Sequence, residues 1–230
     1  MFWQEEPPVD QFQIPNDVVD LMFDIDCREL PVDHAYTLAA AIVEALPWVG
    51  DDLRIGVHAV HGAGSQNGWE RPEHGTASRL ILSRRTRLTL RCPRERQADL
   101  ERGLTGLTLE IGGCPMRVGK AHPKPLSKQT TLGARHVVIA DRGDEDAFLE
   151  WAAAELRDMG IRVRKALCGR SVALATPDGP LATRSLMLAE LSLDESLRLQ
   201  QQGLGSHRAL GCGIFLPHKG IGAVTDRPTG

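Results

Sequence analysis

Apolar and polar residues follow one another in the first half of the chain in a pattern that predicts strands interleaved with two helices. Val18–Cys27 is rich in apolar residues and is typical of a strand. Asp33–Leu46 carries apolar residues at helical spacing, with Asp33 as a natural N-cap and Pro47 as the stop. The other predicted elements are a strand at Leu53–His61, one strand or two with a bend at Arg79–Cys92, a helix at Arg94–Arg102 and a strand pair within Leu107–Val118. The resulting order is β-α-β-β-α-β.

The second half follows a stretch, Gly119–Gln129, in which Pro123 and Pro125 predict a linker. Its predicted strands lie at Arg135–Ala140, Ile161–Leu167, Ser171–Thr176, Thr183–Leu191 and Gly213–Leu216, and its helices at Asp144–Met159 and Leu193–Gln202. Gly160 is expected to end the first of these helices, and Cys168-Gly169-Arg170 to join two strands as a hairpin. The halves share a pattern but no sequence. We therefore predict an α+β protein with a ferredoxin-like (RRM-like, βαββαβ) arrangement in each half.

This pattern sets the expected domain limits. The chain is divided into an N-terminal tail, a first domain, a linker, a second domain that includes a glycine-rich loop, and a C-terminal tail (residues 1–16, 17–120, 121–132, 133–224 and 225–230).

Composition and charge narrow the class of protein. The chain is 42% hydrophobic and 25% charged, which is typical of a globular protein rather than a disordered one. A formal net charge of -3 argues against indiscriminate nucleic-acid binding but allows a local basic groove. The five cysteines are widely spaced without a CxxC pair, so we expect reduced thiols and no structural zinc site. With neither a signal-peptide pattern nor an apolar run of membrane length, we expect a soluble, cytoplasmic protein.

The segment Gly203–Gly222 combines glycines with basic side chains. Glycine reaches backbone conformations closed to other residues and lets a ligand approach the main chain, while the cations indicate a bound anion such as a phosphate backbone. The chain lacks the P-loop lysine pattern and the Rossmann fingerprint, so RNA is favoured over a nucleotide. The expected RNA contacts in this segment are Gly203, Gly205, His207, Arg208, Gly211, Gly213 and His218. Lys219 is a further cation of this segment and a candidate to stabilise negative charge on a phosphate.

The motif Leu210–Gly220, LGCGIFLPHKG, resembles the C-terminal glycine-rich signature of the CRISPR repeat-processing endoribonucleases of the RAMP superfamily. Leu199–Gly205 and Thr183–Ala189 resemble the subgroup found with certain type I systems, and Leu30–Leu38 also matches. The resemblance spans the chain from about Asp17 to Val224. It implies tandem ferredoxin-like domains, cleavage of precursor CRISPR RNA within each repeat, and a basic hairpin of the second domain at the base of the RNA stem.

Histidine can supply the proton transfers of such a cleavage. A base removes the proton of the ribose 2′-OH, an acid protonates the leaving 5′-oxygen, and cations stabilise the charge on phosphorus. His34 is our first candidate for the base, because the resemblance places a catalytic histidine in or just beyond the first helix; a structural role at the helix start is the alternative. His58 is the second candidate, although a structural role is also open to it and to His61.

Arginines gather in two further places. Arg84, Arg85, Arg87 and Arg91 belong to a run that continues through Arg94 and Arg96, with Glu95 as its single acid. A solvated sheet face is the ordinary interpretation, but so many arginines favour RNA contact. The second cluster, expected on a hairpin, is Arg162, Arg164, Lys165 and Arg170. Aromatic residues make up only 4% of the chain, which argues against recognition by base stacking.

We therefore predict a metal-independent endoribonuclease that cleaves CRISPR precursor RNA within the repeat, leaving a 2′,3′-cyclic phosphate and a 5′-OH on mature crRNA. No cofactor and no metal are expected. The expected partners are precursor and mature repeat RNA, subunits of a CRISPR interference complex are candidate partners, and no membrane is expected. The alternative is a catalytically inactive repeat-RNA-binding subunit of such a complex. A third class, a ferredoxin-like protein unrelated to RNA, would leave the glycine-rich segment and the arginine clusters without a purpose.

Overall fold

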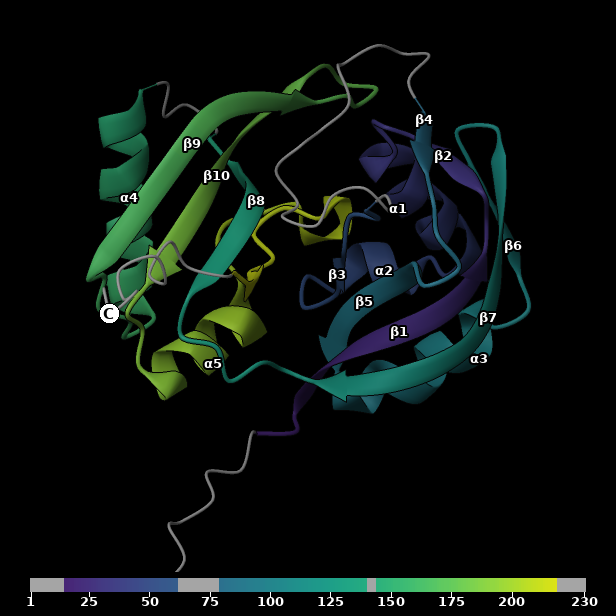
Figure 1. Ribbon diagram of the computed structural model, residues 1–230, viewed down its shortest axis with the longest axis horizontal. Coiled ribbons are helices and arrows are strands. Elements are labelled where there is room, and N and C mark those ends of the chain that lie inside the picture. The colour runs from purple at the N-terminus through teal and green to yellow at the C-terminus, as the bar shows by residue number, and fades with distance from the viewer. Residues whose placement is uncertain (1–14, 62–78, 140–143, 219–230) are drawn as a thin grey trace, which may run out of the picture.

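The computed structural model describes residues 15–61, 79–139 and 144–218 and places them in two main antiparallel sheets with helices against them (Figure 1). The first sheet has five strands in the order β3-β5-β1-β7-β6. Its strands are β1 (Val18–Asp26), β3 (Gly56–Val57), β5 (Arg87–Pro93), β6 (Thr108–Ile111) and β7 (Cys114–Pro125). The helices of this half are α1 (Ala35–Ala45), α2 (Trp48–Asp51), η1 (Arg94–Arg96) and α3 (Gln97–Leu104). Two short strands, β2 (Glu29–Pro31) and β4 (Arg79–Ile81), pair separately.

Alternation along β1 separates the two faces of this sheet. Leu21 and Phe23 are fully buried in a core that also takes Leu38 and Ile42 from α1 and Leu100 from α3. The intervening residues of β1 point to the other face, because successive side chains of a strand alternate. Polar and charged residues on that other face are therefore available for contacts outside the core.

The second sheet has four strands in the order β11-β8-β10-β9. Its elements are β8 (Leu132–Val138), α4 (Glu145–Asp158), β9 (Lys165–Leu174), β10 (Leu181–Ala189), α5 (Leu193–Gln202), η2 (Arg208–Leu210) and β11 (Leu216–Pro217). Asp144 caps α4 by accepting a bond from the Ala147 amide, and Ser192 and Glu195 form a capping box at the start of α5. Gly160, with φ of 70°, comes directly after Met159, the C-cap residue of α4, as expected.

Two predictions are wrong, one for the linker and one for the second half. The expected linker is largely strand, because β7 continues through Gly119 to Pro125 and pairs with β1. The expected hairpin of Ile161–Leu167 and Ser171–Thr176 is a single strand, β9, whose antiparallel partner is β10. A β-carbon on Gly169 would lie 2.1 Å from Ser185 Oγ, so this glycine serves close packing between β9 and β10 rather than a turn.

Two predictions for the first half also need correction. The strand expected at Leu53–His61 contains only Gly56 and Val57, although His58 continues the pairing through its amide, which donates to Thr89 O at 2.9 Å. Asp33 does not cap α1: the N-cap residue is His34, and no side chain caps it. Asp33 instead accepts a bond from the Ala175 amide at 3.2 Å, which links the two halves.

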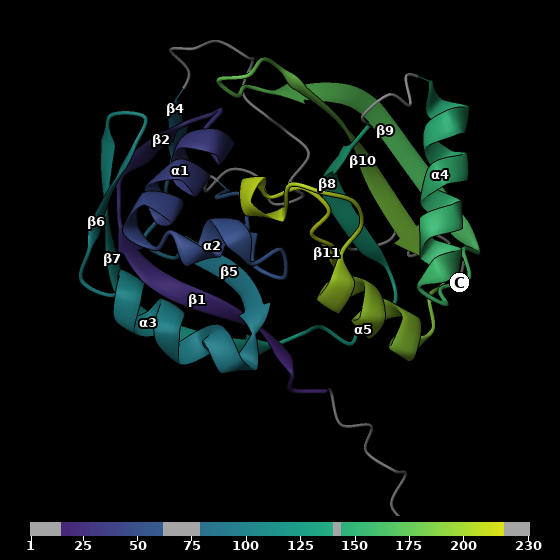
Figure 2. The same cartoon turned by 180° about the vertical axis from the view of Figure 1, so that it is seen from behind.

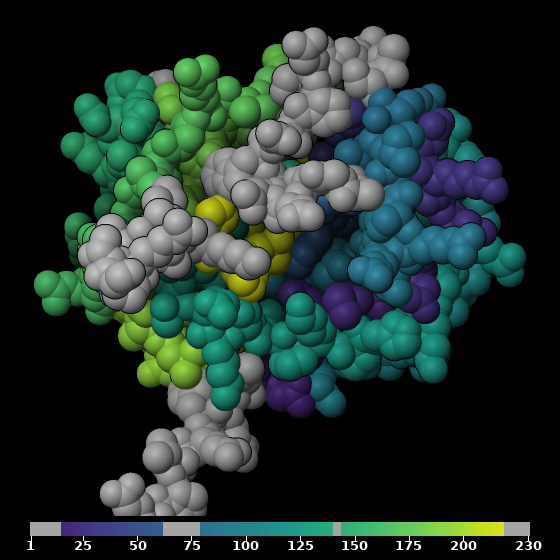
Figure 3. All heavy atoms as spheres, in the orientation of Figure 1, coloured from purple at the N-terminus to yellow at the C-terminus, as the bar shows by residue number. Residues whose placement is uncertain are grey.

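The halves are joined along several segments. Gln200 of α5 exchanges two hydrogen bonds with the backbone of Ser127, and Gln201 donates to Asp17 at 3.0 Å. Seen from behind, η2 and β11 lie between α1 and α2 on one side and β8 on the other (Figure 2). In the space-filling view the yellow C-terminal part of the described chain lies between the green second half and the blue and purple first half (Figure 3). Across the described ranges, no helix has both the length and the apolar character that a membrane span requires.

Candidate functional site

The glycine-rich segment after α5 folds back on itself. The Leu204 amide donates to Gly213 O at 3.1 Å, and both Gly203 (φ 70°) and Gly213 (φ 65°) have left-handed backbones. A β-carbon on Gly213 would lie 2.1 Å from Leu204 O, and one on Gly203 would lie 2.6 Å from Gly213 O. These two glycines are therefore required where the two ends of the loop meet.

The same loop contacts both halves of the molecule. The Gly213 amide donates to His136 O on β8 at 2.6 Å. On the other side, a β-carbon on Gly211 would lie 3.1 Å from Val57 O, so β3 approaches the loop backbone closely. The loop thus lies at the junction of the two sheets.

The tip of the loop is exposed. Gly205, Ser206 and His207 are exposed, and His207 has a left-handed backbone with φ of 63°. The Ser206 hydroxyl and His207 Nδ1 are 2.8 Å apart. This tip presents a histidine and a hydroxyl to solvent, which suits contact with a phosphate or a base.

Arg208 does not belong to that exposed tip. It is buried, and its guanidinium contacts the carbonyls of Gln201 and Gln202 at the end of α5 and of Arg54 in the first half. Burial, helped by the charge of Arg91, lowers the pKa of Arg208 to about 10. The expected RNA contact by Arg208 is incompatible with this position, where a cation stabilises the C-terminus of a helix.

His34 is buried at the start of α1 with both ring nitrogens engaged. Nδ1 lies 2.9 Å from Pro31 O, so it carries the proton and donates. Nε2 accepts a hydrogen bond from the Val60 amide at 3.0 Å. The backbone carbonyl therefore fixes the tautomer in which Nε2 is the basic nitrogen.

His58 directly follows β3 and forms a buried cluster with Asp20 and Arg91. Its Nε2 is 3.4 Å from Asp20 Oδ1, and burial lowers the pKa of His58 below its ordinary value. Burial alone would raise the pKa of Asp20, but hydrogen bonds from His58 and Arg91 outweigh burial and hold that pKa below its usual range. His58 is therefore a buried ring beside a carboxylate, and burial disfavours its charged form.

Arg91 connects the two halves instead of facing RNA. It is 1% exposed, and its guanidinium binds both carboxylate oxygens of Asp20 at 2.8 and 3.0 Å. Its Nη1 donates to Gln200 O at 3.0 Å and to Phe215 O at 2.8 Å. The alternation of β5 was predicted correctly, but the second half covers this end of the face, so the expected RNA contact by Arg91 is wrong.

Three other histidines and Arg135 act electrostatically on His61. Burial lowers the pKa of His61 to about 3, and the neighbouring charges that add to this effect are those of Arg135, His34, His58 and His136. His136 is buried on β8, with Nδ1 2.9 Å from Thr183 Oγ1. Sequence spacing could not group His136 with the others, because only the glycine-rich loop brings β8 next to the segment after β3. Within the described ranges, no set of three or more histidine, cysteine, aspartate or glutamate side chains is arranged to hold a metal ion.

The remaining members of the first arginine cluster lie near the turn before β5. Arg84 and Arg85 are exposed, while Arg87 pairs with Asp24 at 2.9 Å and donates to Arg84 O and Thr86 O. Arg84 and Arg85 therefore have the exposure that RNA contact requires, and Arg87 is partly neutralised.

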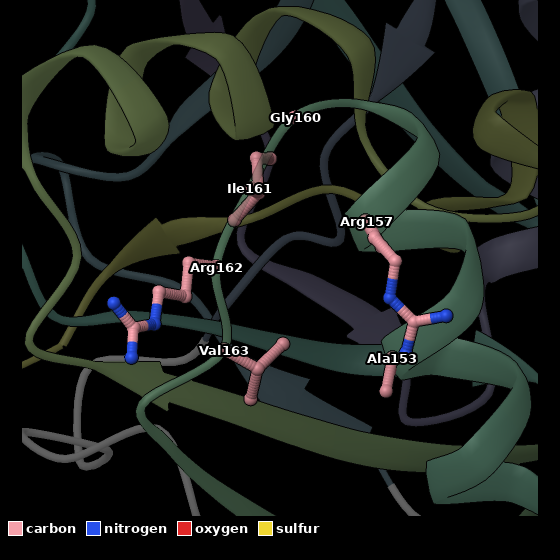
Figure 4. Close-up of a pocket in the computed structure, with 6 residues that line it drawn as sticks. All are labelled: Ala153, Arg157, Gly160, Ile161, Arg162 and Val163. Atoms are coloured by element: carbon pink, nitrogen blue, oxygen red, sulfur yellow. The ribbon is translucent and has the colours of Figure 1, made fainter.

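The second basic cluster lies on the loop before β9 and on β9 itself. All four residues are exposed, and two of them are paired: Arg164 with Glu195 at 2.6 Å and Lys165 with Glu190 at 2.5 Å. A pocket of about 400 Å³ lies beside this loop, lined by Ala153, Arg157, Gly160, Ile161, Arg162 and Val163, with Arg157 and Arg162 on opposite sides (Figure 4). None of the junction histidines lines it.

The last two candidate residues lie near the end of the described chain. His218 is half-buried, with its ring near Gly133 and its amide donating to Thr131 O at 3.0 Å. It is on the β11 side of the junction, close to β8. Lys219 lies outside the described residues.

A family model and a sequence relative both indicate the same protein family. A family model described as Cas6 Crispr matches residues 19–220. A protein of Myxococcus xanthus (strain DK1622), named CRISPR-associated endonuclease Cas6, is 33% identical over 199 residues, covering 86% of this chain and 81% of that protein.

Solved structures share the fold. A Cas6-related protein from Pyrococcus furiosus has a TM-score of 0.61 at 14% identity, covering 86% of this chain and 98% of that one. An RAMP protein described as binding different RNA substrates has a TM-score of 0.56 at 14% identity, covering 86% of this chain and 97% of that one. At this identity the likeness concerns architecture alone.

Proposed function

The chain belongs to the Cas6 family of CRISPR proteins, and from this premise we propose that it is a metal-independent endoribonuclease. Its substrate is CRISPR precursor RNA, cut within the repeat, and its products carry a 2′,3′-cyclic phosphate and a 5′-OH. The 33% identical relative named as an endonuclease supports cleavage over simple RNA binding. In this proposal the two β-α-β-β-α-β halves are tandem ferredoxin-like domains, and the first extends through β7 to Pro125.

The group of histidines whose charges act on His61, near the glycine-rich loop, is the observation that carries the proposal. His34, His58, His61 and His136 come from both halves, and Arg135 adds a fixed positive charge to this group. RNA cleavage through the 2′-OH needs proton transfer and stabilisation of negative charge, and imidazoles with a guanidinium supply both. RNA is therefore the substrate whose chemistry these side chains fit.

His34 is the proposed general base. The bond from Nδ1 to Pro31 O orients the ring and leaves Nε2 as the nitrogen that accepts a proton. The Val60 amide occupies Nε2 in the structure, so the ribose 2′-OH takes the place of that amide when RNA binds. Catalytic hydrogen bonds are commonly completed only in the substrate complex.

His58 remains the second candidate, and His61 is included in the test because its ring is partly exposed. Lys219 is proposed as the cation next to the cleaved phosphate. The exposed loop tip with Gly205 and His207, together with Arg84, Arg85, Arg162 and Arg170, is proposed to hold the RNA backbone. Interference-complex subunits are proposed partners of the product-bound form.

Cleavage of repeat RNA in EDTA tests the function. Wild-type protein should cut the RNA, and end analysis should find the cyclic phosphate and the 5′-OH. Loss of cutting in EDTA would contradict metal independence. Among single variants, His34→Ala should lose about 10²–10⁴-fold in rate, the usual contribution of a general base; a wild-type rate for this variant would move the assignment to His58 or His61.

The alternative, a catalytically inactive subunit that holds repeat RNA, is favoured by one observation. Both ring nitrogens of His34 already have hydrogen-bond partners, and such a ring can be purely structural. Tight repeat-RNA binding by wild-type protein with no cleavage under any metal condition would establish this alternative.

A further inference from the structure

The ring of His136 is held in one tautomer by a short relay. Thr183 Oγ1 donates its proton to Val172 O at 2.8 Å. Because a hydroxyl has one proton to give, its contact with His136 Nδ1 at 2.9 Å must be one in which Nδ1–H donates. In the neutral ring, Nε2 is therefore the basic nitrogen.

This relay suits a ring that gains and loses a proton. When Nε2 is protonated, the bond from Nδ1–H to Thr183 stays in place, so the ring keeps its orientation in both charge states. The relay uses a hydroxyl and a backbone carbonyl instead of a carboxylate, so it does not trap the ring in the charged form. An oriented ring that can hold either charge has the properties of a proton donor in catalysis.

The glycine-rich loop links the strand of His136 to the segment that contacts His34. Its carbonyl accepts from the Gly213 amide at 2.6 Å, which attaches β8 to the glycine-rich loop. Gly211 of that loop approaches the backbone of Val57 and Ala59, and the next residue, Val60, bonds to the His34 ring. The two histidines thus reach the junction from different sheets, and both lie among the groups that act on His61.

The positive charge of Arg135 near the junction favours binding of an anion there. Arg135 and the neighbouring histidines favour the neutral form of His61, whereas a bound phosphodiester would favour the protonated form of any imidazole beside it.

We propose that His136 is the general acid of the cleavage, an inference that rests on the proposed function. The 2′-oxygen loses its proton to the base and forms the new P–O2′ bond. As the P–O5′ bond breaks, His136 Nε2–H gives its proton to the 5′-oxygen. The products are the cyclic phosphate and the 5′-OH. The base then releases its extra proton to water, and His136 takes a proton from water, so both groups return to their starting states.

A sulfur substitution in the substrate tests this role. One repeat RNA is normal, and a second has sulfur in place of the 5′-oxygen at the cut, because a thiolate leaves without being protonated. His136→Asn keeps an amide that can donate to Thr183. It should cut the normal RNA about 10²–10⁴-fold more slowly than wild type and the sulfur RNA at close to the wild-type rate. His34→Ala should be slow on both RNAs.

Two results would overturn the inference: a wild-type rate of His136→Asn on normal RNA, or equal losses on both RNAs. Binding of an RNA with a 2′-deoxy nucleotide at the cut reports folding separately. If His136→Asn loses that binding, His136→Gln is assayed in the same way, and loss in both variants assigns His136 a structural role. Absence of the cyclic phosphate with wild-type protein would refute the proposed function itself, independently of His136.

Discussion

The guanidinium of Arg91, on the first sheet, donates to the backbone carbonyl of Phe215, 2.8 Å away, within the glycine-rich segment. The same side chain binds Asp20, its cross-strand neighbour on β1. One buried ion pair thus holds the segment that carries the loop against the first half.

Arg91→Met should destabilise the protein by about 3–5 kcal/mol, because it leaves the carboxylate of Asp20 buried without its cation. Urea unfolding measures the loss. The double variant Asp20→Asn with Arg91→Met should be less destabilised than the single Arg91→Met, since no uncompensated charge remains. Arg85→Met, at an exposed position, is the control and should change stability by about 0.5 kcal/mol or less.

Gly213→Ala should disrupt the glycine-rich loop. The new methyl group would meet Leu204 O at 2.1 Å on a backbone with φ of 65°. Gly106→Ala is a matched control, since Gly106 also has a positive φ (88°) but no atom within 4 Å of the added carbon. The control should lose about 1–2 kcal/mol from backbone strain alone, and Gly213→Ala should lose more. Equal losses would contradict the close packing of the loop.

Folding stability should fall as the pH drops below about 6.5, in part because of His61. Its folded pKa, about 3, lies below the unfolded value, so the unfolded chain binds a proton that the folded chain does not. This stability is complete above pH 6.5 and is lost as the pH falls toward 3. Each such group contributes at most about 1.4 kcal/mol per pH unit.

Urea midpoints at pH 7.5, 6 and 5 for wild type and His61→Gln isolate the contribution of His61. The variant should show the shallower decline with falling pH. Parallel curves would mean that His61 has an ordinary pKa in the folded protein.

The exposed arginines before β5 should contribute to RNA affinity through phosphates. Changing Arg84, Arg85 and Arg87 to alanine should weaken binding and flatten the dependence of log K on log salt by about 0.7–0.9 for each phosphate that is no longer neutralised. Arg102→Ala, at a side chain that is 77% exposed and paired with Asp99, is the control and should leave the slope unchanged. An unchanged slope in the triple variant would make this cluster a solvated surface.

The type of most helices and strands could be predicted from the local sequence pattern, whereas the burial of charged side chains could not. The alternation of β1 and the spacing of α1 are properties of neighbouring residues, so the sequence was sufficient to predict them. Arg91 lies on the polar face of β5, and its burial depends on α5 and Phe215, which are more than a hundred residues away in the chain. Local pattern contains no information about such a partner.

Only part of the candidate site could be predicted, because local pattern does not show which distant residues pack together. The sequence singled out the glycine-rich segment and His34, but it missed His136, whose neighbours are set by how the loop packs. One signal was present: His136 is followed in its predicted strand by four apolar residues, Val137 to Ala140, and a polar ring in such a strand needs a partner. Gly169 misled the prediction of β9, because glycine in a strand can serve close packing as well as a turn.

The contact between Arg91 and Phe215 also bears on how the protein is made. Synthesis proceeds from the N-terminus, so Asp20 and Arg91 leave the ribosome long before Phe215 and Gln200. Until then the first half carries a charged pair on an uncovered sheet face and lacks two of the carbonyls that hold its arginine. Final closure of the junction therefore awaits the last part of the chain, and a nascent protein that stalls before α5 would leave that face open to chaperones.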